Sequence, residues 1–520
     1  MARLRSLSAA EAATLVFLSL WSVAPLVLML RHAAASGETF TGSDGPFAGD
    51  QLQYLSWIRE SGEGFLAGNE FDLPSSDAVF LHPMHVVSGA LWSLGLGIQA
   101  AYLIWKPVAV IALFAGFALF VRRTVEGAAA RAAALVLALF YFPPFGEFLG
   151  RTDTGSAELP PKLAEVVGEI FAAGALWGYL PTAIAIGAMP IYLLAAERTL
   201  DADGQGRRRA LAVTAAAGLV ASWLHPWQGE VLALVTVGLM AWGRFGRPVL
   251  PLLVPLAATL VPLVSYFGLS EFDSAWEVAR AQNEEPHLEA WVIAAGLGPL
   301  LPMAVYGALK RPPRDLIDRS LILLPVAMLV VYAGLQQVPG HALEGISLPL
   351  AVLSVRGWQA LPLRLPAAVG ALAAAVLVVP GVFLAADLMR DQVRGRVQPH
   401  YLRADEARAM DELRRDPRPG GVLADPSLAA AVPAHAGRPV WAGHPSWTRD
   451  FPNRFRELDE LFSGRIGGPA AVDLVRRSGA RFALAGCRQR ADLRVTAPGV
   501  VASARRFGCA TLYELRREPG

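Results

Sequence analysis

The strongest constraint on this chain is a series of long apolar stretches that recurs over its first 386 residues. A helix needs about 20 apolar residues to cross the hydrocarbon core of a bilayer, and each stretch approaches that length. About eleven such stretches are present, at 12–31, 105–122, 131–149, 175–196, 208–224, 225–243, 249–268, 289–309, 318–336, 343–360 and 366–386. The mean hydropathy of +0.40 agrees with this pattern. The sequence therefore predicts a mainly α, polytopic membrane bundle.

Charge and motifs exclude several other classes. The net charge of +2 is too small to suggest a nucleic-acid partner. The sequence has neither a phosphate-cradling glycine loop nor the cysteine spacing of a zinc site. Membrane lipid is the partner that the composition predicts.

The distribution of basic residues predicts the orientation, because Lys and Arg accumulate in short cytoplasmic loops. With a cytoplasmic amino terminus, the inner loops hold basic clusters at 122–123, 207–209 and 310–314, whereas the outer loops hold few. We therefore expect a multi-pass protein of the plasma (inner) membrane. A cleaved signal peptide ending near 33–36 is the alternative, but the first apolar stretch exceeds the 7–15 residues of a signal core.

Two domains are expected: a membrane domain over 1–390 and an extracytoplasmic domain over 400–520. In the second, apolar runs shrink to strand length, as at 421–424, 439–442 and 481–485, and helical patterns alternate with them. This alternation predicts a small α/β domain.

Both cysteines of the chain, Cys487 and Cys509, fall in this second domain. An oxidising exported compartment would allow them to form a disulfide. Two unpaired buried thiols are the alternative.

A long loop over 32–104 separates the first two spans and lies on the predicted outer side. The spacing of Gln51, Tyr54 and Ile58 predicts an amphipathic helix with Asp50 near its start. A carboxylate on a rigid element at the membrane edge can remove a proton from an acceptor hydroxyl. A helix cap is the alternative role for Asp50.

Basic and polar side chains near the outer membrane edge are the other candidates. His82-Pro83 predicts the start of a juxtamembrane helix that continues to about residue 104, since proline is favoured in a first turn. Cations there would hold an anionic lipid phosphate, although a lysine can also snorkel to the headgroups. The candidate substrate-binding residues are Tyr54, Arg59, His82, His85, Lys106, Glu169, His225, Glu230, His341 and Glu344.

Three short motifs carry a resemblance to a known class of enzymes. Asp50-Gln51-Leu52-Gln53-Tyr54, His82-Pro83 and Lys106-Pro107 resemble the membrane glycosyltransferases of the GT-C class, especially the aminoarabinose and protein mannosyl transferases. The run Arg438-Pro439-Val440-Trp441-Ala442-Gly443-His444 is similar to the carboxyl-terminal domains of such enzymes. The resemblance implies that Asp50 is the catalytic acid position and that His82 contacts the phosphate.

The chain also departs from that class. Gln51 stands where the family often has a second acid, and 179–182 carries none of the acids that the family frequently has at the fourth span. Glu169 would have to substitute, or Asp153 or Glu165. The resemblance therefore leaves a divalent metal cofactor open.

The predicted function is transfer of a sugar from a polyprenyl-phosphate donor to an acceptor on the outer face. One alternative is a transporter or flippase of a lipid-linked or small substrate, which predicts ionisable groups deep in the spans and inverted repeats. The other is a catalytically inactive GT-C-like scaffold.

Overall fold

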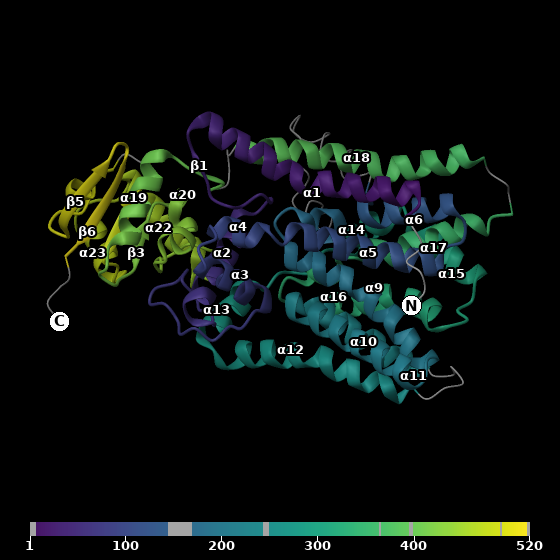
Figure 1. Cartoon of the computed structure of the whole chain (residues 1–520). Helices are drawn as coiled ribbons and strands as arrows, with labels where there is room; N and C mark the ends of the chain where they lie inside the picture. The colour runs from purple at the N-terminus through teal and green to yellow at the C-terminus, as the bar shows by residue number, and fades with distance from the viewer. Residues whose placement is uncertain are drawn as a thin grey trace. The chain divides into compact units, whose positions relative to one another are not determined.

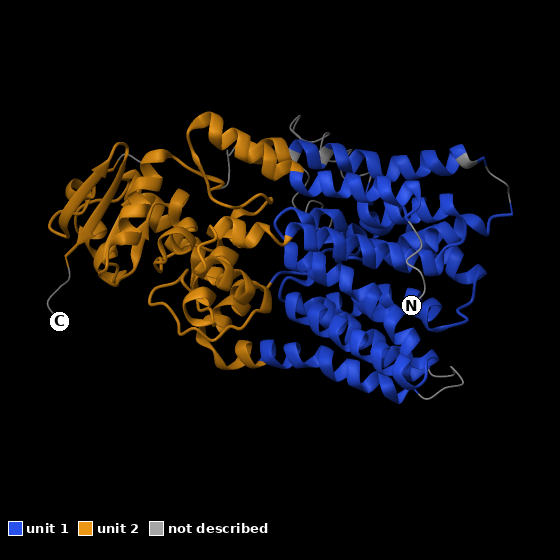
Figure 2. Ribbon diagram, viewed as in Figure 1, with its two compact units in different colours: residues 1–23, 106–267, 285–388 blue, residues 24–105, 268–284, 389–520 orange. Residues whose placement is uncertain are grey.

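The computed structural model describes residues 7–143, 169–242, 249–362, 366–394, 399–488 and 491–516. They divide into two compact units (Figure 2). Unit 1 comprises Met1–Val23, Lys106–Phe267 and Glu285–Leu388, and unit 2 comprises Ala24–Trp105, Gly268–Glu284 and Met389–Gly520. The units differ from the expected domains, because the first long loop and Gly268–Glu284 both group with the carboxyl-terminal domain.

Unit 1 is built from helices (Figure 1). Three of them, α1, α12 and α18, continue into unit 2. The α-helices are α1 (Ala9–Ser36), α5 (Lys106–Thr124), α6 (Ala128–Phe140), α9 (Leu180–Asp201), α10 (Gly204–Leu224), α11 (Pro226–Trp242), α12 (Leu253–Phe272), α14 (Ala290–Leu297), α15 (Leu301–Lys310), α16 (Leu316–Gly334), α17 (Ser347–Gln359) and α18 (Ala367–Val393). The 3-10 helices are η1 (Ala172–Leu176), η2 (Leu250–Leu252) and η3 (Pro339–Leu343).

Every predicted apolar stretch coincides with a helix or, at 289–309, with the bent pair α14 and α15. The part of 131–149 beyond residue 143 lies outside the described residues. Within the described ranges, six helices are long and apolar enough to span a membrane, or seven if the pair bent by 72° is one span. The helices α6, α11 and α17, with 13, 17 and 13 residues, are too short for that test. The predicted membrane bundle is confirmed, whereas the count of eleven spans stays a prediction.

Close contacts between helices in unit 1 depend on glycine. A Cβ at Gly116 of α5 would lie 2.1 Å from the Gly187 carbonyl oxygen of α9. Small residues of this kind let two backbones approach closely, which is how membrane helices gain packing energy without a hydrophobic driving force.

Unit 2 combines helices with short strands. Its helices are α2 (Ala48–Gly64), α3 (Pro83–Ser93), α4 (Ile98–Leu103), α13 (Ser274–Gln282), α19 (Ala404–Arg415), α20 (Pro426–Ala429), α21 (Ala431–Ala436), α22 (Phe451–Ser463), α23 (Pro469–Arg477) and α24 (Leu493–Thr496). Its strands are β1 (Thr39–Phe40), β2 (Tyr401–Leu402), β3 (Val422–Ala424), β4 (Phe482–Ala485), β5 (Val501–Phe507) and β6 (Ala510–Leu515).

The carboxyl-terminal domain is an α/β domain, as predicted. Its sheet has the order β3-β4-β6-β5, with β3 and β4 parallel and the other neighbours antiparallel. The core on one face is formed by Leu458 and Phe462 of α22, Leu474 of α23, and Ala483 and Tyr513 of the sheet. The predicted strand at 439–442 was wrong: within it only isolated bridges form, Val440 with Val422 and Ala442 with Asp72.

The first loop forms the predicted helices. The amphipathic pattern from Asp50 becomes α2, and Pro83 opens α3, with His82 at its N-cap. The predicted juxtamembrane helix is broken into α3 and α4, and α4 runs on into the apolar segment of α5.

Cys487 and Cys509 form a disulfide, with Cα atoms 4.9 Å apart. The bridge ties the segment after β4 to the turn between β5 and β6. A cross-link that closes 22 residues restricts the unfolded chain and contributes on the order of 3 kcal/mol.

We predict that Cys487→Ser with Cys509→Ser lowers the free energy of unfolding of this domain by about 3 kcal/mol. Urea unfolding of the full chain, followed by proteolysis of the carboxyl-terminal domain, measures the change. Dithiothreitol should destabilise the parent and leave the double variant unaffected. Equal sensitivity of both proteins to the reductant would contradict the assignment.

Candidate functional site

Asp50 lies in the first turn of α2, where a carboxylate is favoured by the helix dipole. It does not cap the helix, since Phe47 is the N-cap residue and no side-chain cap bond forms there. The opposite face of α2 is fully buried through Leu52, Leu55 and Ile58. Asp50 itself keeps 36% of its side-chain surface exposed. A rigid helix therefore presents an accessible carboxylate.

One oxygen of that carboxylate contacts the carboxyl-terminal domain. The Nε2 atom of His444 lies 3.1 Å from Asp50 Oδ1, and the imidazole is only 2% exposed. Sequence analysis missed His444 as a site residue. No periodicity links positions 394 residues apart, and the one available signal was the position of His444 in the run that resembles the family's terminal domains.

Tyr54 lies one helical turn after Asp50. Its ring packs near His85 and Tyr102, with both centroid distances 5.8 Å. The structure thus places Tyr54 between the start of α2 and the aromatic cluster described next.

His82 and His85 lie in an aromatic cluster with Trp57 and Phe80. The two imidazole centroids are 4.0 Å apart, and both side chains are buried. Among the described residues, neither nitrogen of His85 has a hydrogen-bond partner. Burial lowers the pKa of His82 to about 3, and burial together with His82 lowers the pKa of His85. Both rings are therefore neutral at pH 7, which makes them poor counter-ions for a phosphate.

Arg59 fastens the loop to the carboxyl-terminal domain. Its Nε donates to the Ala434 carbonyl oxygen at 3.1 Å, and a terminal nitrogen donates to the His435 carbonyl oxygen at 3.3 Å. The guanidinium also lies over the Trp92 ring, 4.9 Å from the centroid. These contacts occupy donors of the guanidinium, so Arg59 has a structural role in holding the loop against the terminal domain.

Lys106 begins α5 in unit 1. Its ammonium donates to the carbonyl oxygens of Ser22 and Leu176, each at 2.9 Å, and the side chain is buried. Backbone carbonyls thus stabilise this buried charge.

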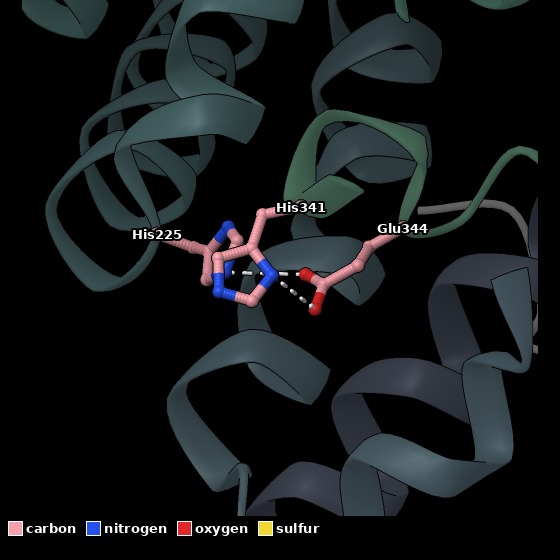
Figure 3. Close-up of side chains that lie close together, drawn as sticks. All are labelled: His225, His341 and Glu344. Atoms are coloured by element: carbon pink, nitrogen blue, oxygen red, sulfur yellow. Dashed lines mark ion pairs between the residues drawn. The ribbon is translucent and has the colours of Figure 1, made fainter. Parts of the chain in front are cut away.

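The other acid and histidine candidates form a cluster in unit 1. His225 follows α10, His341 lies in η3 and Glu344 follows η3, and the three side chains point toward one another (Figure 3). Glu344 approaches His225 Nε2 at 3.2 Å and His341 Nδ1 at 3.6 Å. Glu169 approaches the same His341 nitrogen at 3.0 Å.

Four predicted site residues from three separate segments of the chain thus meet. Glu230 lies on α11, and among the described residues no ion pair joins it to this cluster.

The donor set of this cluster fits a divalent metal. One ligand atom each from His225, His341 and Glu344 lies within 4.8 Å of the others. Two imidazoles and a carboxylate are ligands that suit zinc and neighbouring transition metals, and Glu169 is in reach as a fourth. The same groups also suit an ion-pair network without a metal.

The comparisons with known proteins agree on the fold. No protein-family model matches the sequence, and no curated protein matches it as a relative. The chain is similar in structure to the archaeal oligosaccharyltransferase AglB from Archaeoglobus fulgidus, solved with an inhibitory peptide and a dolichol-phosphate. That match has a TM-score of 0.51 and 13% identity, and covers 91% of this chain and 69% of that chain.

ArnT from Cupriavidus metallidurans, bound to undecaprenyl phosphate, matches with a TM-score of 0.50 and 15% identity, over 95% of this chain and 97% of that one. The mycobacterial arabinofuranosyltransferase AftD matches with a TM-score of 0.50 and 15% identity, over 96% of this chain and 42% of that one. The chain shares the fold of these membrane proteins, which is the fold that the resemblance to the GT-C class implied.

We predict that the purified protein, stripped with a chelator, binds one zinc ion through the cluster. Isothermal titration with zinc measures the binding, and elemental analysis measures the metal content. His225→Ala should weaken zinc binding by at least about tenfold, since one of three ligands is lost. His32→Ala, which changes a partly exposed histidine outside the cluster, is the matched control. Equal zinc binding by the parent and His225→Ala would show that the cluster is an ion-pair network only.

Proposed function

We propose that this chain is an integral membrane glycosyltransferase. It moves a sugar from a polyprenyl-phosphate donor to an acceptor on the outer face of the membrane. The observation that carries the proposal is the accessible Asp50 carboxylate at the start of a buried helix. Its support is the GT-C fold, shared with proteins solved with dolichol-phosphate and undecaprenyl phosphate.

In the proposed reaction Asp50 is the general base. It takes the proton of the acceptor hydroxyl as the acceptor oxygen forms a bond to the anomeric carbon. The bond between that carbon and the phosphate oxygen breaks, and its electron pair leaves with the lipid phosphate. One displacement of this kind inverts the anomeric configuration.

The departing phosphate needs positive charge or hydrogen-bond donors. The neutral, buried His82 and His85 supply no charge, and Arg59 is engaged by backbone carbonyls. Separately, His225, His341 and Glu344 of unit 1 would hold a divalent metal, which would supply Lewis-acid chemistry when bound.

The assay offers purified protein a panel of polyprenyl-phosphate sugars and measures release of free lipid phosphate. We predict that Asp50→Asn lowers kcat by roughly 10²–10⁴-fold, because it removes the proton acceptor and keeps the size and the hydrogen-bond acceptor. The melting temperature should stay close to that of the parent. Glu63→Gln, an exposed carboxylate on the last turn of the same helix, is the matched control and should keep its activity.

Turnover by Asp50→Asn at the parental rate would refute the role of Asp50. A parent that releases no lipid phosphate from any donor would favour the inactive scaffold.

The orientation is tested by labelling in intact cells with a maleimide that cannot cross membranes. Because basic residues crowd the inner loops, we predict that single cysteines at Glu63 and Asp473 react and that one at Asp203 does not. All three side chains are well exposed, so accessibility does not limit the reaction. The two native cysteines do not react with the maleimide, because they form a disulfide. Labelling at Asp203 would reverse the topology and place Asp50 on the cytoplasmic side.

A further inference from the structure

We propose that His444 is the positioning residue for Asp50, so that the carboxyl-terminal domain completes the site that activates the acceptor. The inference rests on the proposed function for its catalytic consequence. It stands on four described features of unit 2: the tautomer of His444, its burial, the bonds that hold its turn, and its contact with Asp50.

The tautomer follows from the hydrogen bonds of the ring. The backbone N–H of Ser446 donates to His444 Nδ1 at 3.1 Å, so Nδ1 carries a lone pair. In a neutral imidazole the single proton then resides on Nε2. That nitrogen lies 3.1 Å from Asp50 Oδ1. His444 therefore donates a hydrogen bond to the carboxylate.

The turn that carries His444, residues 443–448, is held firmly. The backbone N–H groups of Gly443 and His444 donate to Thr448 Oγ1 at 3.1 and 3.3 Å. The Thr448 hydroxyl in turn donates to the Phe71 carbonyl oxygen at 2.6 Å. The Phe71 ring packs against the imidazole with centroids 5.6 Å apart. These bonds therefore hold the His444 ring in position in the absence of substrate.

Two more contacts join the same turn to neighbouring segments. Asn69 Nδ2 donates to the Trp447 carbonyl oxygen at 2.7 Å, and the Ser446 hydroxyl donates to Asn283 Oδ1 at 2.8 Å. The turn of residues 443–448 is thus bonded to the first long loop and to the residue that ends α13.

This geometry suits a general base. A donor fixed at Oδ1 limits rotation of the carboxylate, and a hydrogen bond to a charged acceptor is stronger than one between neutral groups. An ionised carboxylate has about four lone-pair sites, and the bond from His444 occupies one of them. After proton transfer Asp50 is neutral, and His444 Nε2 still donates to Oδ1. The pairing is therefore compatible with both protonation states of Asp50.

The alternative is that the contact only fastens the terminal domain to the loop. Loss of a purely structural contact would lower the melting temperature. Loss of a positioning contact would lower kcat, and only in a protein whose Asp50 can act as a base. The two are separated by combining substitutions at both positions.

The first experiment measures kcat, KM and melting temperature. His444→Phe keeps an aromatic ring and removes the donor, and we expect kcat to fall by about 10–100-fold with little change in KM, as for other residues that orient a reactive group. His444→Gln places an amide N–H near the Nε2 position and should restore most of the activity. In an Asp50→Asn background, His444→Phe should cause no further loss.

His435→Phe is the matched control. His435 is a second buried histidine of the same domain, and its Nε2 contacts the Thr41 carbonyl oxygen of the first loop at 3.0 Å. This nitrogen of His435 contacts a backbone carbonyl rather than Asp50, so folded His435→Phe should keep the parental kcat. Parental kcat in folded His444→Phe would overturn the proposal, and so would a further loss in the Asp50→Asn background.

The second experiment needs no turnover. Nitrogen-15 spectra of histidine-labelled protein in liposomes should show His444, assigned by its loss in His444→Gln, as the Nε2–H tautomer. Asp50→Leu removes the acceptor and should shift the Nε2 resonance. An Nδ1–H tautomer, or a resonance unmoved by Asp50→Leu, would reject the pairing. An inactive parent with the expected spectrum would instead reject the proposed glycosyl transfer and leave the contact between the two residues established.

Discussion

The attachment of α2 to the carboxyl-terminal domain is the constraint on which the site in unit 2 depends. The apolar face of α2 is buried, and the Arg59 guanidinium in its second half donates to two carbonyl oxygens of the terminal domain. Upstream, β1 pairs with β2, and downstream Asp72 forms an ion pair with Arg454. Contacts before, within and after the helix therefore fix its position. A carboxylate on so constrained a helix has few orientations available, which is the condition for efficient proton abstraction.

Local signals in the sequence were sufficient for the helices. The apolar stretches, the amphipathic pattern after Asp50 and the His82-Pro83 start all depend on neighbouring residues, and the structure has a helix at each. The contact between Asp50 and His444 depends on tertiary folding across 394 residues, and no pattern in a single sequence encodes such a pairing. The strand expected at 439–442 is reduced to isolated bridges, because a short apolar run does not reveal how many of its residues will pair.

Sequence analysis was equally unable to predict whether a histidine side chain is exposed to water or buried. His82 and His85 were interpreted as cations beside a lipid phosphate, since both occur near a membrane edge. In the structure Trp57 and Phe80 exclude water from both rings, and burial favours the neutral form. By contrast, Glu169, His225, His341 and Glu344 were named from separate loops and do meet. The carboxyl groups and imidazoles of these residues contact one another, which lowers the free-energy cost of burying them.

Gln51 gives the departure from the family motif a physical reason. Its side-chain oxygen accepts the backbone N–H of Asp44 at 2.9 Å and that of Gly45 at 3.3 Å, which closes the turn leading into α2. A carboxylate at this buried position would add a second negative charge one residue from Asp50, and like charges at close range raise the free energy of the ionised pair. The neutral amide supports the turn without that repulsion. His444 then donates to Asp50, and the proposed proton transfer uses a single carboxylate.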